Sequence, residues 1–325
     1  MQHFDPKEMT VQEIFRLLQG GIAPRPIALV STLSSSGIRN LAPFSFFNAF
    51  GGNPPTVIFS PSRRQRDGTV KDTYTNLTAT RECVIQAVTY AMVQQVSLAS
   101  TEYSSDVDEF VKCGLTPINS DKVKPPRVAE SPFQMECILK QMIPIGDGPG
   151  SGNLAICEVV RFHIDERVVK DGQIDPQLLD LVGRNSADWY TRASGDAVFY
   201  VKKPITSIGI GVDQIPETIR NSGVFTASNL GQLGNSERMP TDDELRGFAA
   251  LLSPAEGSSF EFESRHKHND YRMMFRIAST TARTNVEQGA TRMELAARCA
   301  LESANDIEFA WKAALCAAMV RRGEA

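Results

Sequence analysis

The stretch that decides the fold is residues 24–61, PRPIALVSTLSSSGIRNLAPFSFFNAFGGNPPTVIFSP. Pro26 to Thr32 is a short apolar and β-branched run that ends in a Ser-rich turn, and the chain resumes at Asn40, which predicts a hairpin. After Pro54-Pro55, the apolar run from Thr56 to Phe59 predicts a buried strand. The stretch therefore predicts three strands.

Pro43 interrupts the run over residues 40–47, which otherwise reads as a strand. Proline cannot donate to a sheet ladder, so this run belongs at a sheet edge or at a bulge. Backbone groups that are released from pairing there can face a ligand.

Five short motifs in this order resemble the flavin reductase-like family of FMN-binding split barrels, which includes flavoredoxin and the reductase components of two-component monooxygenases. The motifs are PRPIALVST at 24–32, NLAPFSFFN at 40–48, Pro54-Pro55 leading to Ser60, KDT at 71–73, and Arg184 with Tyr190. The resemblance implies a mainly β fold with α (α+β). We expect an FMN-binding split β-barrel with flanking helices over residues 1–200 and a C-terminal extension over residues 201–325.

Two short segments carry residue types that bind a phosphate group. Hydroxyls, cations and free amides at a helix start form an anion site, and by the resemblance the anion is the FMN phosphate. The residues expected to hold it are Ser60, Ser62, Lys71 and Thr73. The alternative is that Lys71 is surface charge and Thr73 only caps a helix. Arg63 and Arg64 are either further phosphate ligands or ordinary surface charge.

By the same resemblance, residues 40–45 run along the edge of the isoalloxazine ring and bind it through backbone amides and the Ser45 hydroxyl. The residues implied are Asn40, Leu41, Ala42, Pro43, Phe44 and Ser45. Preformed donors of this kind stabilise the reduced ring; the alternative is an edge strand without a ligand. Arg184 is either a contact to the FMN or nicotinamide phosphate or part of a structural salt bridge, because residues 185–187 replace the family's glycine pair.

The resemblance implies an NAD(P)H:flavin oxidoreductase that transfers hydride from NADH or NADPH to FMN. The cofactor carries that chemistry, so no catalytic side chain is expected, and no GxGxxG motif indicates a Rossmann domain. Two alternatives stay open, a flavoredoxin-like electron-transfer protein reduced by a protein donor and a non-catalytic FMN-binding or scaffold module. The expected partners are a second copy of the chain in a homodimer and an oxygenase or electron-transfer protein.

Composition limits the remaining function classes. A net charge of -4 gives no electrostatic case for nucleic acid, and the apolar stretches are shorter than the ~18 residues that span a bilayer. The six cysteines form no CxxC pair, which predicts buried free thiols in a reducing compartment, so we expect a cytoplasmic protein. The N-terminus has neither a cationic start nor an apolar core, so no secretory signal is expected. His266 and His268 predict a solvated loop rather than a metal site, and no metal is expected.

The remaining elements follow from caps and periodicity. Thr10 and Glu13 form a capping box that predicts a helix ending at Gly20-Gly21. Asp72 or Thr73 is expected to cap the next helix. Helices are predicted over residues 71–83, 90–100 and 106–113, and strands over residues 84–88, 133–145 and 154–164.

The amino-acid composition of the chain changes after about residue 200. Residues 204–240 are rich in Gly, Pro, Asn and Ser, which predicts an irregular connection. Thr241 is expected to cap a helix over residues 242–252, and an alanine-rich helix is expected from about Thr291 to Val320. We expect this extension to pack on the barrel or dimer, with a small independent domain as the alternative.

Overall fold

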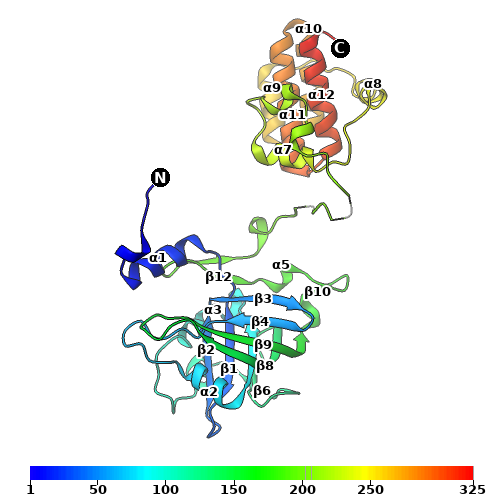
Figure 1. The fold of residues 1–325 in the computed structure, drawn as a ribbon. Helices are drawn as coiled ribbons and strands as arrows, with labels where there is room; N and C mark the ends of the chain where they lie inside the picture. The colour runs from blue at the N-terminus through cyan, green and yellow to red at the C-terminus, as the bar shows by residue number, and fades with distance from the viewer. Residues whose placement is uncertain (202, 206, 325) are drawn as a thin grey trace. The chain divides into compact units, whose positions relative to one another are not determined.

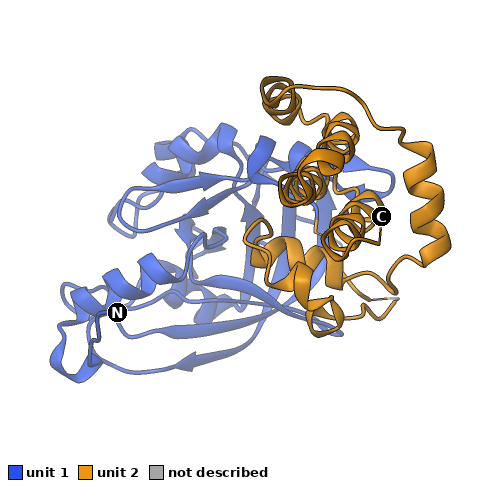
Figure 2. Cartoon of the chain, turned by 90° about the horizontal axis from the view of Figure 1, so that it is seen from above, with its two compact units in different colours: residues 1–200 blue, residues 201–325 orange. Residues whose placement is uncertain are grey.

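The computed structural model describes residues 1–201, 203–205 and 207–324. The chain divides into two compact units, Met1–Tyr200 and Val201–Ala325, which Figure 2 shows in separate colours. Within the described residues, no helix has both the length and the apolar character needed to cross a membrane.

The first unit is built on a seven-stranded antiparallel sheet with the order β2-β1-β5-β8-β9-β4-β3. Its strands are β1 Ala28–Leu33, β2 Arg39–Phe44, β3 Phe47–Gly52, β4 Pro55–Phe59, β5 Glu82–Ala87, β8 Phe133–Pro144 and β9 Asn153–Ile164 (Figure 1). The two edge strands, β2 and β3, follow each other in the chain and are separated only by Ser45 and Phe46. This short connection requires the sheet to curl until its edges approach. The expected mainly β barrel-type fold is confirmed.

The decisive stretch contains four strands rather than the three predicted. The missed strand is β3, which pairs with β4 across an irregularity between Ala49 and Gly51. Gly51 and Gly52 resemble a loop in the sequence, but pairing with β4 extends the backbone there. The prediction for Pro43 is confirmed, because it lies opposite Leu29 in the edge strand β2.

Alternate residues of the strands fill the barrel interior, as the period of two requires. Buried members of this cluster include Val30, Phe44, Phe59, Ile85 and Cys137. Leu29 and Leu41, on the opposite faces of β1 and β2, belong to a second cluster that also contains Met92, Phe110 and Val128 from other elements. All six cysteines are buried and free, which confirms that prediction.

Short elements complete the first unit. Its helices are α1 Val11–Gly21, α2 Asp72–Thr80, α3 Val93–Leu98, α4 Glu109–Cys113 and α5 Pro176–Leu179. Its two-stranded pairs are β6 Pro117–Ile118 with β7 Arg127–Val128, β10 Val169–Lys170 with β11 Gln173–Ile174, and β12 Val182–Arg184 with β13 Tyr190–Arg192. The predicted capping box of Thr10 and Glu13 is present. The predicted cap of α2 is wrong, since Lys71 is the N-cap and no side chain caps this helix.

The second unit consists of helices around their own hydrophobic core. The helices are α6 Glu217–Arg220, α7 Ala227–Gly234, α8 Asp242–Leu251, α9 Ser259–Lys267, α10 Tyr271–Thr284, α11 Val286–Ala304 and α12 Ile307–Arg322. Trp311 is buried at the centre of this core, together with Phe262, Met274 and Phe309. The predicted cap of α8 by Thr241 is confirmed.

Three sequence predictions for this unit are wrong. The single alanine-rich helix is two helices, because Asn305 adopts a left-handed conformation with φ of 50° and Asp306 caps the next helix. The segment 204–240 contains α6 and α7, although its residue 206 lies outside the described part. His266 lies in α9 and His268 ends it, so the pair is not in a loop. The capping box of Ser258 with Glu261 marks the start of α9 and could have revealed it.

Candidate functional site

The loop that follows β4 brings hydroxyl and cationic groups together. The Ser60 and Ser62 hydroxyl oxygens are 3.0 Å apart, and Ser60 Oγ accepts the backbone N–H of Asn153 at 3.1 Å. Arg63 Nη1 donates to the carbonyl of Gly68 at 2.9 Å. Arg63 Nε, in contrast, is buried and has no hydrogen-bond partner among the described residues. An unpaired cationic donor of this kind is costly unless an anion meets it.

Lys71 stands at the start of α2, where no side chain bonds the first free backbone N–H groups. Its ammonium lies 5.2 Å from the centre of the Phe44 ring. Burial, and secondarily the nearby Arg64 guanidinium, lowers the pKa of Lys71. Arg64 itself is occupied, since it bonds the Val70 carbonyl and lies 3.8 Å from the Asp72 carboxylate. Among the residues that the structure describes, the free groups at this helix start are therefore the Lys71 amine and backbone amides.

Thr73 and Asn40 meet in a buried polar cluster that joins α2 to the sheet. Asn40 Nδ2 donates to the hydroxyls of Thr32 and Thr73, each at 3.0 Å. Asn76 Nδ2 donates to Thr32 Oγ1 at 3.2 Å. The structure thus brings these two predicted residues together, but their side chains bond each other and hold the helix start in place.

The backbone donors of β2 are more restricted than the sequence suggests. The N–H of Leu41 donates to Glu109 Oε2 at 3.1 Å, and Pro43 has no N–H. Strand pairing alternates, so the ladder bonds to β1 come from the remaining residues, Asn40, Ala42 and Phe44. The outward N–H groups expected to meet a flavin ring are absent at Pro43 and already bonded at Leu41. The backbone after Phe44 and the Ser45 hydroxyl are left to face a ligand.

Glu109 was not predicted as a site residue. It begins α4 and is only 7% exposed, and its burial raises the pKa of the carboxyl group. Its partner Leu41 is 68 residues away in the chain, so no local pattern links the two.

Arg25 is the second residue that sequence reasoning missed, although it lies in the PRP motif. It is 5% exposed and donates to the carbonyls of Gln19, Ile22 and Asn185 at 2.6 to 2.9 Å. Its Nε also lies 3.4 Å from Ser45 Oγ. Arg25 therefore ties the end of α1 and the turn after β12 to the residue that follows β2.

Arg184 lies in β12 and pairs with Arg25 through backbone hydrogen bonds. Its guanidinium donates to the Tyr190 hydroxyl and to the Ala187 carbonyl, each at 2.5 Å, and stacks 4.7 Å from the Tyr190 ring centre. Asp188 lies 3.9 Å away. Both Nη groups of Arg184 thus make a hydrogen bond within the hairpin of β12 and β13.

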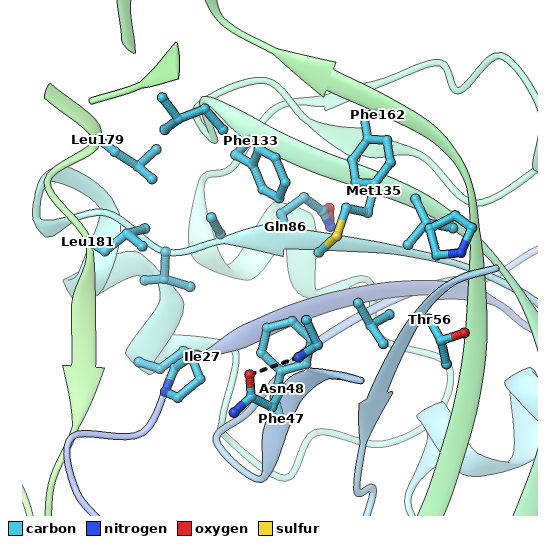
Figure 3. A pocket seen from close by; sticks show the side chains of 18 of the residues that line it. Ile27, Phe47, Asn48, Thr56, Gln86, Phe133, Met135, Phe162, Leu179 and Leu181 are labelled. Carbon is cyan, nitrogen blue, oxygen red and sulfur yellow. Dashed lines mark hydrogen bonds between the residues drawn. The ribbon is translucent and has the colours of Figure 1, made fainter. Parts of the chain in front are cut away.

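An apolar pocket of about 370 Å³ opens beside the β2–β3 connection. Figure 3 shows Ile27, Phe47, Phe133, Phe162 and Leu181 around it, contributed by five separate segments. None of the predicted FMN-binding residues lines this pocket. The sequence could not reveal it, because its walls come from distant parts of the chain.

One group of side chains has the composition of a metal site. Asp121, Glu136 and His163 place one possible ligand atom each within 4.8 Å of one another. The buried Glu136 carboxylate, however, accepts the backbone N–H groups of residues 121–123 at 2.6 to 3.1 Å and lies 2.6 Å from His163 Nε2. Its oxygens anchor a turn, which accounts for its burial without an ion.

Residues of the barrel unit match a known domain family. The profile of the flavin reductase like domain matches residues 21–183. An uncharacterized protein from Aquifex aeolicus is 33% identical over 194 residues, which are 59% of this chain and 96% of that protein.

Two solved structures are similar. Nitrilotriacetate monooxygenase component B from Bacillus cereus is 32% identical with a TM-score of 0.58, over 62% of this chain and 98% of that chain. A structure from Shewanella frigidimarina with a split barrel domain is 24% identical with a TM-score of 0.53, over 62% of this chain and 100% of that chain, and shows the fold. The chain belongs to the flavin reductase-like domain family, and residues 21–183, within its first unit, are the part that matches.

Proposed function

We propose that the barrel unit binds FMN and that the protein is an NAD(P)H:flavin oxidoreductase. Membership of the family supports a flavin-linked oxidoreductase role. The choice of FMN and of a nicotinamide donor is our inference from the residues around the β2 edge and the start of α2.

The observation that carries the FMN proposal is the buried, unpaired Arg63 Nε in the loop after β4. It lies in the same loop as the Ser60 and Ser62 hydroxyls, and Arg64 connects that loop to the uncapped start of α2. Cations, hydroxyls and helix amides together are the donor set that a phosphate dianion requires. These residues would hold the FMN phosphate. Burial lowers the pKa of Lys71, and a bound phosphate would favour its charged form.

The residues after β2 would hold the ring. FMN supplies the redox chemistry when it is bound, by accepting hydride from a nicotinamide. Arg25 orients Ser45, whose hydroxyl and neighbouring backbone would bind the ring edge. Glu109 holds β2 by its bond to Leu41, so the strand presents Ser45 without rearrangement.

We further propose that a second copy covers the apolar pocket of the barrel. Its surroundings expose large apolar side chains, with Phe50 64%, Phe162 48% and Leu178 51% accessible. Large apolar side chains that are exposed beside an apolar pocket favour an interaction site. Phe162 lines the pocket itself, while Phe50 lies on β3 and Leu178 on α5. A homodimer would remove this surface from water.

The similar protein from Bacillus cereus is component B of a monooxygenase. We propose by analogy that this protein passes electrons to an oxygenase or electron-transfer protein. Six free buried cysteines favour the cytoplasm as its location.

FMN and riboflavin titrations of the purified protein test the phosphate site. Arg63→Gln should weaken FMN binding by about 1.5–3 kcal/mol, the contribution of a hydrogen bond to a charged group. Riboflavin lacks the phosphate, so its affinity should not change. The control is Arg66→Gln in the same loop, where the side chain is 74% exposed and already paired with Asp67 and Glu102. Equal losses of FMN and riboflavin affinity would reject the assignment.

Anaerobic stopped-flow absorbance tests the reaction. NADH or NADPH should bleach the bound flavin. If both leave it oxidised and a reduced protein donor bleaches it, the protein is an electron-transfer flavoprotein instead.

A further inference from the structure

The C-terminal unit contains a cavity of about 530 Å³ among α8, α10, α11 and α12. Its walls are mainly apolar and include Leu252, Phe275, Met293 and Val320. Volumes of about 300–1,000 Å³ with apolar walls and a few polar groups are typical of small-molecule sites. The family match ends at residue 183, so the family assigns this cavity no role.

Two closely packed helices form one wall of the cavity. A Cβ atom built on Gly289 of α11 would lie 2.4 Å from the Cα of Ala282 on α10, so only glycine permits this approach. Ala282 and Val286 line the cavity beside this crossing. Direct backbone contact leaves little room for the wall to collapse, so the cavity is preformed.

A single arginine supplies positive charge to the lining. Arg283 lies in the last turn of α10, is exposed and lines the cavity. Within the part of the chain that the structure describes, its side chain has no hydrogen bond or ion pair. Several other arginines of this unit are paired; Arg272, for example, bonds Asp306 and Arg321 bonds Glu294. A free guanidinium beside an apolar cavity is suited to an anion that carries an apolar tail.

We propose that this cavity binds a small carboxylate with an apolar tail, of the medium-chain fatty acid class. The tail would displace water from the apolar walls, and the carboxylate would accept hydrogen bonds from Arg283. The proposal does not depend on flavin binding.

Isothermal titration of the full chain with decanoate and with decanol tests the proposal. Decanoate should bind saturably, and Arg283→Gln should weaken it roughly tenfold, as expected for one lost charge-assisted hydrogen bond. Decanol, which has the same tail and no charge, should bind both proteins alike and more weakly than decanoate binds the wild type. The control is Arg220→Gln on α6, because Arg220 is also exposed, has no side-chain partner among the described residues and does not line the cavity.

Two further measurements place the ligand in the cavity. Ala249 is an exposed lining residue on α8, so Ala249→Trp should fill the mouth and abolish decanoate binding without lowering the melting temperature. Cys316 also lines the cavity, and decanoate should slow its modification by a small thiol reagent, followed by peptide mass spectrometry.

Three outcomes would overturn the proposal. They are absence of saturable decanoate binding, equal decanoate affinity in the wild type and Arg283→Gln, and binding that Ala249→Trp leaves intact. If Arg283→Gln lowered only the melting temperature, the guanidinium would merely complement the negative end of α10.

Discussion

The two units use buried polar groups in different ways. In the barrel unit, buried carboxylates accept backbone N–H groups, as Glu109 does from Leu41 and Glu136 from residues 121–123. In the helical unit, the buried Glu294 carboxylate pairs with the Arg321 guanidinium. A sheet edge and its loops leave backbone donors that helices satisfy internally. Buried carboxylates in the barrel unit therefore satisfy backbone donors of edges and loops, whereas the buried carboxylate of the helical unit is satisfied by a side-chain cation.

The largest expected effect is the difference in FMN binding between the two units when each is prepared as a separate fragment. Each has its own hydrophobic core, and the proposed flavin residues all lie in the first unit. A fragment of residues 1–200 should bind FMN with an affinity within about threefold of the full chain, and residues 201–325 should not bind it. Fluorescence titration measures both, and light scattering reports whether the first fragment forms the proposed homodimer. Loss of FMN binding in residues 1–200 would show that the helical unit completes the site.

A core substitution should destabilise one unit only. Trp311 is 2% exposed, and its indole N–H bonds the Leu233 carbonyl at 3.1 Å and Ser236 Oγ at 3.0 Å. Trp311→Ala should lower the free energy of unfolding of the helical unit by about 3–5 kcal/mol. Urea unfolding followed by circular dichroism measures this loss. FMN affinity should be unchanged, and a parallel fall in affinity would contradict the independence of the two units.

Removing the Glu109 carboxylate should have a smaller effect on the barrel. Glu109→Ala leaves the buried N–H of Leu41 without its partner, at a cost of about 1–3 kcal/mol. Thermal unfolding should show this loss, whereas Glu109→Gln retains an acceptor oxygen and should recover most of it. Equal destabilisation by both variants would mean that charge, rather than the hydrogen bond, holds β2.

The pH dependence of stability should have opposite signs at two carboxylates. Burial raises the pKa of Glu109 above 4.5, so its contribution is full below pH 4.5 and is lost as the pH rises through the raised value. The Arg238 hydrogen bonds lower the pKa of Glu244 on α8 to about 2, so its contribution is present above pH 4.5 and is lost as the pH falls towards 2. Both effects are small, because the Glu244 side chain is only partly buried. Melting curves of Glu109→Gln and Glu244→Gln against the wild type from pH 3 to 7 should diverge in opposite directions.

Local signals in the sequence were reliable where one segment determines its own conformation. The capping residues Thr10 and Thr241 start helices as expected, and Pro43 lies in an edge strand. These features depend on backbone geometry within a few residues of each signal. The alanine-rich run was misread at Asn305, because alanine favours a helix on either side of the break and does not reveal it.

The same distinction between local signals and long-range contacts applies to the candidate site. The sequence by itself determined the barrel family and the two segments, residues 60–64 and 71–73, that carry phosphate-binding residue types. Only the tertiary structure showed that Glu109 occupies the Leu41 amide, that Arg25 holds Ser45 and that Arg63 Nε lacks a partner. It alone showed the cavity of the helical unit as well. The reason is physical: residue type and spacing determine local backbone conformation, whereas the partner of a buried polar atom and the walls of a cavity come from segments that meet only when the chain folds.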